Sequence, residues 1–203
     1  MTDAGFILAT RNQKKLSELQ RILAASGVDV GVTDLSGYPD LPGAAETGAT
    51  FTENALLKAR GVVAHTGVPA VAEDSGLYVD ALNGMPGVLS ARWAGRHGDD
   101  EANLRLVLAQ LADVPADRRG GHFACVAALV LPSGQEHVTE GTVNGRIANA
   151  PHGTNGFGYD PIFVPVSSEL TMAEMSPEAK DAISHRGRAL RALAPVIAEL
   201  LGG

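Results

Sequence analysis

The sequence has a single cysteine, Cys125, and few aromatic residues. A lone thiol excludes an internal disulfide, which suits a reducing compartment. Because Cys125 lies within the apolar run 123–131, we expect it to be a small core residue. Aromatic residues make up only 4% of the chain, whereas small and aliphatic residues are abundant. This composition favours compact α/β packing over an aromatic-rich sandwich.

The sequence also lacks an excess of positive charge. Lys and Arg together number 16 against 23 Asp and Glu, which gives a formal net charge of -7. Nucleic-acid-binding proteins usually carry a basic face, so a DNA or RNA partner is disfavoured. A phosphate-bearing small molecule needs only local positive charge and stays compatible with this composition.

Long hydrophobic runs and several familiar motifs are missing as well. No apolar run approaches the roughly 20 residues that span a bilayer, and the N-terminus has no signal-peptide pattern. We therefore expect a soluble, cytoplasmic protein with no membrane partner. The histidines and the cysteine do not show the spacing of a zinc site, and no Gly-x-Ser-x-Gly elbow supports a serine hydrolase.

The chain of 203 residues fits one domain, 1–203, and 45% hydrophobic residues can form a sizeable core. Apolar runs predict strands at 5–10, 28–32, 68–72 and 159–164, and a hairpin of strands at 122–131 and 136–143. Helices are predicted after Asn12, from a capping box at 50–53, at 99–112, and from Ser176 to Leu201 with a break near Ser184. This order predicts an α/β fold with a mixed sheet and a loop at 33–48.

A polar segment joins the first predicted strand to the first predicted helix; it consists of Thr10, Arg11, Asn12, Gln13, Lys14 and Lys15. Backbone N–H groups at a helix start are unpaired and suit a phosphate. Thr10 and Asn12 add donors, and Lys15 adds a full positive charge. The glycine-rich loop of a Walker motif is absent, and a merely polar strand end before a capped helix is the alternative interpretation.

Three acidic residues form a second candidate cluster: Glu46, Glu73 and Asp74. The last two end an apolar strand, and in α/β sheets the carboxyl ends of strands face the ligand crevice. Neighbouring strand residues point to opposite faces, so only one of the two can aim into a given site unless the strand has already turned. Asp74 with Glu46 would suffice for Mg²⁺, which takes few carboxylates plus phosphate oxygens. A solvated acidic turn is the alternative.

Two further segments could recognise a base. The loop 153–161 carries glycines and two aromatic residues, which could stack on a base or simply pack into the core. Lys180 precedes Ser184, His185 and Arg186. The donor fork of Arg186 suits a purine 6-keto oxygen and mismatches the 6-amino group of adenine. An ordinary polar helix face is the alternative for this segment.

Taken together, these segments resemble the inosine triphosphate pyrophosphatase family, also called the Ham1 or RdgB-like family. The resemblance spans nearly the whole chain, and its six pieces in this order are specific. The pieces are Thr10-x-Asn12-x-x-Lys15; Glu46-Thr47-Gly48 with Thr50-Phe51-x-Glu53-Asn54-Ala55 and Lys58; Glu73-Asp74-Ser75-Gly76-Leu77; Pro86-Gly87-x-x-Ser90-Ala91-Arg92; Gly156-Phe157-Gly158-Tyr159-Asp160-Pro161-x-Phe163; and Lys180-x-x-x-Ser184-His185-Arg186.

The resemblance implies an elongated mixed β-sheet flanked by helices, in two lobes with a central cleft, and a homodimer. It implies Mg²⁺-dependent hydrolysis of ITP, dITP, XTP and dXTP to the monophosphate and pyrophosphate, which would cleanse the nucleotide pool of deaminated purines. By the same resemblance, residues 10–15 and Lys58 would bind the triphosphate. Glu46 and Asp74 would bind Mg²⁺, and Asp74 would also be the catalytic base.

The remaining implied roles concern the substrate pocket. Ser75 would line the site; the base would be oriented by Phe157, Gly158, Tyr159 and Asp160; and Lys180, His185 and Arg186 would complete the purine pocket. We also expect one cleft to gather the acidic cluster around Asp74 together with Lys15 and Arg186, which come from opposite ends of the chain. A pyrophosphatase for other nucleotides and a non-catalytic nucleotide-binding module stay open as alternatives, although Asp74, Glu46 and Lys58 argue against the second.

Overall fold

A computed structural model describes residues 5–41 and 43–202 of the chain. The strands are β1 (Phe6–Leu8), β2 (Val32–Asp34), β3 (Ala70–Val79), β4 (Gly120–Val130), β5 (Glu136–Ile147) and β6 (Phe163–Pro165). The α-helices are α1 (Gln13–Ala25), α2 (Phe51–Thr66), α3 (Asp100–Gln110), α4 (Pro177–Ile183) and α5 (His185–Leu201).

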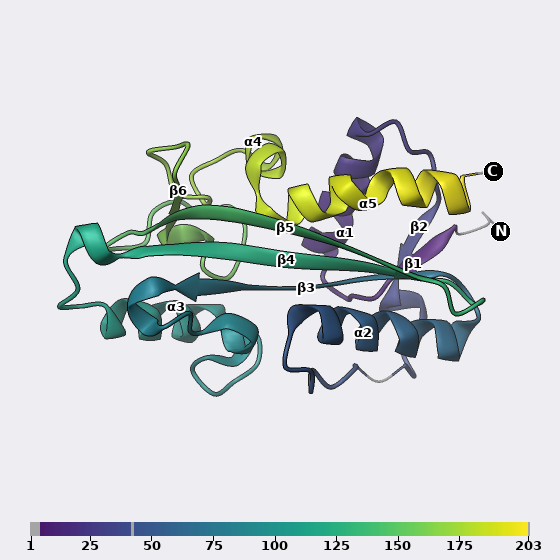
Figure 1. Ribbon diagram of the computed structural model, residues 1–203, viewed down its shortest axis with the longest axis horizontal. Coiled ribbons are helices and arrows are strands. Elements are labelled where there is room, and N and C mark those ends of the chain that lie inside the picture. Colours follow the sequence, from purple (N-terminus) through teal and green to yellow (C-terminus); the bar gives the residue numbers. More distant parts are fainter. Residues whose placement is uncertain (1–4, 42, 203) are drawn as a thin grey trace. The chain divides into compact units, whose positions relative to one another are not determined.

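The strands form one mixed six-stranded sheet in the order β2-β1-β3-β4-β5-β6 (Figure 1). Strand β1 is parallel to both β2 and β3, whereas β5 and β6 are antiparallel. The connection at 131–135 is too short for a parallel crossover, so β4 and β5 form the antiparallel hairpin that the sequence predicts. The α/β fold with a mixed sheet is confirmed.

The chain divides into two compact units. The first comprises the described residues up to Asp74 with 125–141 and 186–202, and the second comprises 75–124 and 142–185. Strands β3, β4 and β5 contribute a segment to each unit. Because the segments of the two units alternate along the sequence, neither unit is a continuous stretch of chain. The single domain over 1–203 stays a prediction.

The core of the first unit lies on both faces of its strands. Phe6, Leu8 and Val71 pack with apolar residues of α1 and α5, whereas Ile7, Ala70 and Ala72 pack with those of α2. Figure 1 shows α2 on one side of these strands and α5 on the other. Successive strand residues thus face opposite helices, as the period of a β-strand requires.

The second unit has its own core. Leu77 and Val79 of β3 pack with Leu104 and Val107 of α3 and with Phe123 of β4. The same cluster includes Val143, Ile147, Tyr159, Ile162, Phe163 and Met172. Residues that follow Asp74 in β3 therefore belong to a different core from those that precede it.

Helices α1, α2, α3 and α4 begin at side-chain N-caps in the positions that the sequence predicts. Asn12 accepts from the Lys14 N–H at the start of α1, Asp99 caps α3 and Ser176 caps α4. Thr50 accepts from the Glu53 N–H, and the Glu53 carboxylate accepts from Ala49 N rather than closing back on Thr50. Ser184 has an extended backbone between α4 and α5, which confirms the expected break.

Several strand boundaries were predicted wrongly. Strand β1 is shorter than the predicted 5–10, and β5 runs to Ile147 instead of ending at 143. Strand β2 begins at Val32 instead of at 28, because Gly27 turns the chain with a positive φ of 70° and the Val28 N–H still bonds to the Leu23 carbonyl of α1. Strand β3 runs to Val79 instead of ending at 72, so Glu73 and Asp74 lie inside it. The predicted strand at 159–164 begins with a 3₁₀ turn, and only residues from Phe163 are in β6.

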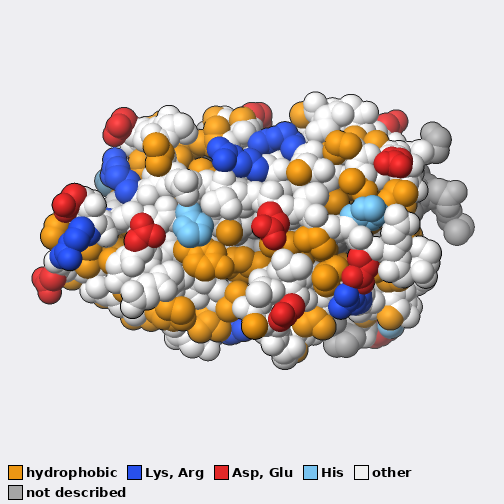
Figure 2. Space-filling view, viewed as in Figure 1, with side chains coloured by type: hydrophobic (Ala, Val, Ile, Leu, Met, Phe, Trp, Pro, Cys, Tyr) orange, Lys and Arg blue, Asp and Glu red, His pale blue; other side chains and the backbone are white. Residues whose placement is uncertain are grey.

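One surface of the molecule mixes side chains of every kind. Figure 2 shows Lys and Arg in separate groups among Asp, Glu and hydrophobic side chains on the face in view. Within residues 5–41 and 43–202, no helix is both long and apolar enough to cross a bilayer.

Replacing Leu19 by Ala is expected to destabilise the first unit. Leu19 lies on the face of α1 that packs against the sheet, and its side chain is 0% exposed. The substitution therefore leaves a cavity and lowers the free energy of unfolding by about 2–5 kcal/mol. Leu57→Ala on α2, where Leu57 is 38% exposed, is the matched control and costs less than about 1 kcal/mol. Urea titrations followed by circular dichroism measure both, and equal losses would contradict the core assignment.

Candidate active site

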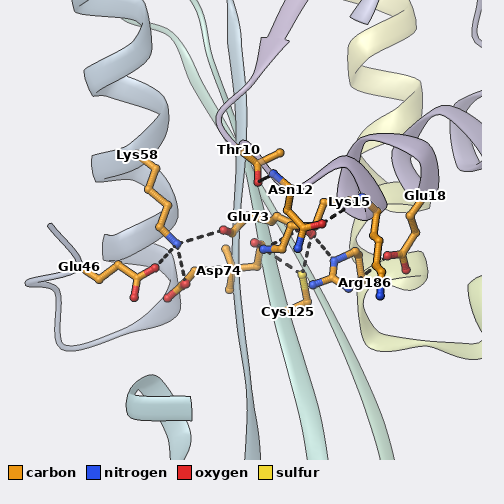
Figure 3. Close-up of polar contacts among 12 residues, drawn as sticks. Thr10, Asn12, Lys15, Glu18, Glu46, Lys58, Glu73, Asp74, Cys125 and Arg186 are labelled. Atoms are coloured by element: carbon orange, nitrogen blue, oxygen red, sulfur yellow. Dashed lines mark hydrogen bonds and ion pairs between the residues drawn. The ribbon is translucent and has the colours of Figure 1, made fainter. Parts of the chain in front are cut away.

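Adjacent carboxylates on β3 face opposite sides of the sheet. Val71 packs toward α1 and α5, and Glu73, two residues on, contacts groups on those two helices. Ala72 packs toward α2, and Asp74 contacts groups on that helix. Figure 3 shows the two carboxylates directed away from each other on the same strand. The uninterrupted pleat of β3 therefore creates two separate polar clusters within the first unit.

The first cluster surrounds Asp74. Lys58 of α2 lies 2.8 Å from Asp74 Oδ1 and 2.6 Å from Glu46 Oε1, so one ammonium joins both carboxylates (Figure 3). The same Nζ lies 3.3 Å from the Glu73 carbonyl oxygen. Asn54 of α2 donates to Asp74 Oδ2 at 3.1 Å. Lys58 and Glu46 remain partly exposed, so this cluster is open to a ligand.

Burial and charge have opposing effects on the pKa of Asp74. Burial raises the pKa of this carboxyl, and the neighbouring Glu46 charge adds to the rise; the Lys58 ammonium and the Asn54 donor lower it, and the net shift is upward. Burial alone would lower the pKa of Lys58, but Asp74 and Glu46 raise it above its usual value. Lys58 therefore stays charged, and Asp74 is a stronger proton acceptor than an exposed aspartate.

The second cluster surrounds Glu73. Lys15 Nζ lies 3.1 Å from Glu73 Oε1, and Arg186 Nε donates to Oε2 at 2.6 Å. Arg186 also pairs with Glu18 of α1 at 3.2 Å, and Cys125 Sγ lies 3.8 Å from Glu73 Oε2. Buried charges are tolerated only when they are paired, and here Lys15 and Arg186 together balance the two carboxylates of Glu73 and Glu18.

The charges of this cluster fix its protonation states. Burial works against ionised Glu73, but Arg186 and Lys15 outweigh it and lower the pKa of the carboxyl to about 2. Burial raises the pKa of the Cys125 thiol, which confirms this residue as a core cysteine. Glu73 therefore carries a permanent negative charge at neutral pH.

Lys15 and Arg186 do come together from the two ends of the chain, as expected, but around Glu73 and not around Asp74. Arg186 is 2% exposed and forms ion pairs with the carboxylates of Glu18 and Glu73. Its guanidinium is thus occupied in a buried ion-pair network. Lys15, whose side chain is 21% exposed, keeps one side accessible. Lys15 and Arg186 pair with Glu73 and not with Asp74 because β3 continues past both residues, which places the two carboxylates on opposite faces of the sheet.

The segment 10–15 is held in place by its own side chains. Asn12 N donates to Thr10 Oγ1 at 3.1 Å, and Asn12 Oδ1 accepts from Lys14 N at 3.0 Å. Arg11 donates to the carbonyls of Tyr38 and Leu41, and Gln13 donates to the Asp34 carboxylate. Of the cations in this segment, Lys14 is exposed and Lys15 is half-buried beside Glu73.

Of the predicted base-binding residues, all but Arg186 lie in the second unit. Asp160 Oδ2 accepts from Phe157 N at 2.8 Å and from Lys180 Nζ at 2.6 Å. The Lys180 ammonium also lies 5.2 Å from the centroid of the Phe157 ring. The Asp160 carboxylate thus ties the aromatic loop to helix α4. Gly156 fits closely here, because a Cβ at this position would lie 2.0 Å from Asp160 Oδ2.

Of the two aromatic side chains in this loop, only one is accessible. Tyr159 is buried in the core and donates its hydroxyl to the Ser90 carbonyl at 2.8 Å, whereas Phe157 is partly exposed. Gly158 N donates to Asp100 at 2.9 Å. His185 is buried and stacks on Phe123, with ring centroids 4.5 Å apart. Phe157 is therefore the aromatic group best placed to stack on a ligand.

The carboxylates near Lys58 fit a hard divalent cation. Glu46 and Asp74 reach the same ammonium, so their oxygens converge on one point where positive charge is stabilised. Across residues 5–41 and 43–202 there is no group of three or more His, Cys, Asp or Glu side chains that could hold a metal ion. Two carboxylates that leave positions for phosphate oxygens and water would match the preference of Mg²⁺.

Sequence reasoning left three residues of these clusters without a role: Glu18, Glu73 and Asn54. Glu73 was set aside in favour of Asp74, although alternation along a longer β3 would have placed it beside α1 and α5. Asn54 was recognised only as part of a motif. A buried polar residue within a helix that is otherwise apolar on that face is the signal that could have identified it.

These features describe an α/β protein in which two acidic side chains and a lysine form an open polar site. A model of the Ham1 family matches residues 6–196, and the chain belongs to this family. A relative called dITP/XTP pyrophosphatase from Streptomyces coelicolor is 59% identical over 196 residues, which cover 97% of this chain and 98% of the relative. A relative of the same name from Nocardia farcinica is 58% identical over 204 residues, which cover 98% of this chain and 98% of the relative.

Solved structures agree with this assignment. The crystal structure of a nucleoside-triphosphatase / dITP/XTP pyrophosphatase from Mycobacterium abscessus is 58% identical, with a TM-score of 0.74 and coverage of 94% of this chain and 98% of that one. A Ham1 protein from Coxiella burnetii is 41% identical, with a TM-score of 0.85 and coverage of 96% and 98%.

Replacing Glu73 by Gln is expected to remove an acid-sensitive part of the stability. The folded pKa of about 2 lies below the ordinary 4.5, so the carboxylate stabilises the fold above about pH 4.5 and this contribution fades as the pH falls toward 2. At neutral pH the variant leaves Arg186 short of a partner and lowers the free energy of unfolding by about 3–5 kcal/mol.

The control for this substitution is Glu136→Gln. Glu136 pairs with Arg60 at 2.6 Å on the surface, so its loss costs at most about 1 kcal/mol. Urea titrations between pH 3 and pH 7 would compare the two variants with the wild type. A Glu73→Gln protein as stable as the wild type at pH 7 would remove Glu73 from its structural role.

Proposed function

We propose that the chain hydrolyses deaminated purine nucleoside triphosphates, ITP and XTP and their deoxy forms, to the monophosphate and pyrophosphate. The convergence of Glu46 and Asp74 on Lys58 carries the proposal, because two carboxylates beside a lysine suit a metal-bound polyphosphate. The Ham1 family and relatives called dITP/XTP pyrophosphatase support the same substrate class. In a cell, this activity would cleanse the nucleotide pool; we further propose a cytoplasmic homodimer.

The phosphate chain is proposed to bind along the first unit. Lys15 and Lys58 supply the charges, and the capped start of α1 presents polar groups of Thr10, Asn12 and Lys14. Lys15 is pre-positioned by its ion pair with Glu73, so it loses little side-chain entropy on binding. Arg11 and Gln13 hold this segment against the loop 34–41.

Glu46 and Asp74 are proposed to hold Mg²⁺, which would supply positive charge against the phosphates when bound. Asp74 is proposed to accept the proton of the attacking water. Asn54 and Lys58 hold one oxygen each of its carboxylate, so its orientation toward that water is fixed. The water attacks the α-phosphorus in line, and the lysines stabilise the charge that develops on the leaving pyrophosphate.

The base is proposed to bind in the second unit. Phe157 offers a partly exposed ring; its backbone N–H donates to Asp160, and the Lys180 ammonium lies 5.2 Å from the ring centroid. Gly158 and Tyr159 shape the same loop, and Ser75 follows the catalytic Asp74 directly in β3. His185 and Arg186 remain proposed as pocket residues. Because Arg186 is bound in buried ion pairs with Glu73 and Glu18, we propose that it acts on the pocket through these two carboxylates.

Asp74→Asn tests the proposed base. The amide keeps the size of the side chain but cannot accept a proton, so kcat is expected to fall by about 10²-fold or more. Steady-state release of pyrophosphate from ITP measures the effect, and circular dichroism checks that the variant folds. Turnover within about tenfold of the wild type would exclude Asp74 as the base.

A panel of triphosphates tests the proposed specificity. ITP and XTP are expected to exceed ATP, GTP and CTP in kcat/KM by orders of magnitude. A pocket built for a 6-keto group rejects ATP and CTP because they leave its polar groups unpaired, whereas GTP keeps the 6-keto oxygen and is rejected at its 2-amino group. Each substrate is assayed with Mg²⁺ and with EDTA, and release is expected only with the metal. Binding of ITP with no pyrophosphate release under either condition would indicate a sensor and contradict the proposal.

A further inference from the structure

Asn54 is a completely buried polar residue beside the proposed catalytic base. It lies in the first turn of α2 and is 0% exposed. A buried side-chain amide is costly unless its donor and acceptor are both satisfied. Here both are satisfied, and each bond reaches a segment that carries a proposed metal ligand.

The Nδ2 donor of the Asn54 amide bonds to Asp74 in β3. Asn54 Nδ2 donates to Asp74 Oδ2 at 3.1 Å, while Lys58 Nζ donates to Asp74 Oδ1 at 2.8 Å. Each carboxylate oxygen of Asp74 thus has its own donor from α2. With both oxygens held, the plane of the carboxylate is fixed.

The acceptor side of the amide bonds to the loop that carries Glu46. Gly48 N donates to Asn54 Oδ1 at 2.8 Å, and only one orientation of the amide allows this bond together with the bond to Asp74. The loop gains a second anchor, because Ala49 N donates to the Glu53 carboxylate at 2.7 Å. The position of Glu46 therefore depends on α2.

The close approach of this loop requires glycine at position 48. A Cβ on Gly48 would lie 2.6 Å from Glu53 Cβ, 2.8 Å from Asn54 Oδ1 and 3.1 Å from Asn54 N. Contacts this short force the loop away from α2. This is an independent sign that the loop is built to contact the Asn54 amide.

We propose that Asn54 is a positioning residue that sets the separation and orientation of Asp74 and Glu46. One planar amide joins the carboxylate of the proposed base to the loop of the second proposed metal ligand. The inference rests on the proposed function, since it concerns the geometry of that site. Asn54 acts through these two residues and not on the substrate.

Three variants separate the two bonds of the amide. Asn54→Ala removes both, Asn54→Asp keeps an acceptor for Gly48 N but replaces the donor to Asp74, and Gly48→Ala displaces the loop while leaving Asn54 intact. Each is expected to lower kcat for ITP by roughly 10- to 100-fold, the range seen when groups that orient metal ligands are lost. KM is expected to stay within about threefold of the wild type.

The matched control is Asn103→Ala in the second unit. Asn103 is also a buried asparagine in a helix, and its side-chain amide makes two hydrogen bonds. Its Nδ2 donates to the Ala91 carbonyl at 3.2 Å, and its Oδ1 accepts from Ala94 N at 2.7 Å. It contacts none of the proposed catalytic groups. Asn103→Ala is expected to lower the melting temperature about as much as Asn54→Ala, while its kcat stays within about threefold of the wild type.

A second readout does not depend on turnover. ITP binding measured by calorimetry in EDTA is expected to stay within about threefold for the Asn54 and Gly48 variants, because the lysines and the base pocket are untouched. Crystal structures of the folded variants without metal are expected to show a rotated Asp74 carboxylate or a shifted Glu46 loop.

Either of two results would overturn the inference: a kcat in the Asn54 variants no lower than in Asn103→Ala, or a loss of ITP affinity in EDTA that parallels the loss of kcat. If Asn54→Ala does not fold, Asn54→Asp and Gly48→Ala carry the same test. A wild-type protein that releases no pyrophosphate would overturn the proposed function, whereas an active wild type with unaffected variants overturns only the role of Asn54.

Discussion

The burial of two consecutive carboxylates in one strand is the constraint on which the site depends. Glu73 and Asp74 lie inside β3, where an uncompensated charge would be prohibitively costly. Because alternate residues face opposite sides, a single cation cannot neutralise both side chains. The fold provides Lys15 and Arg186 on one side and Lys58 on the other. Helices α1 and α5 are thereby tied to one face of β3 and α2 to the other.

This arrangement gives chemically identical groups different tasks. Two cations lower the pKa of Glu73 to about 2, so it is always ionised and serves to hold charges in place. Asp74, buried beside one lysine and a second carboxylate, has a raised pKa and is suited to accept a proton. Environments that push two carboxyl pKa values apart are a general means of assigning structural and acid–base roles.

The sequence was most informative where local chemistry decides structure. Asn12 and Thr50 cap helices as predicted, and the hairpin at 131–135 follows from its turn residues. The end of β3 was misjudged because Glu73 and Asp74 look like a turn, and only tertiary ion pairs make them tolerable inside a strand. For the same reason, the burial of Arg186 could not be predicted from helical spacing. The mixed sheet and the family followed from patterns that span the chain, whereas the role of Asn54 required side-chain geometry.

The central claim is that this site directs water to the α-phosphorus of a purine nucleoside triphosphate. Hydrolysis of ITP in ¹⁸O-labelled water, followed by mass spectrometry of both products, tests it most directly. Attack at the α-phosphorus places the label in IMP and leaves pyrophosphate unlabelled. Label in the pyrophosphate, or release of inorganic phosphate in place of pyrophosphate, would contradict the account.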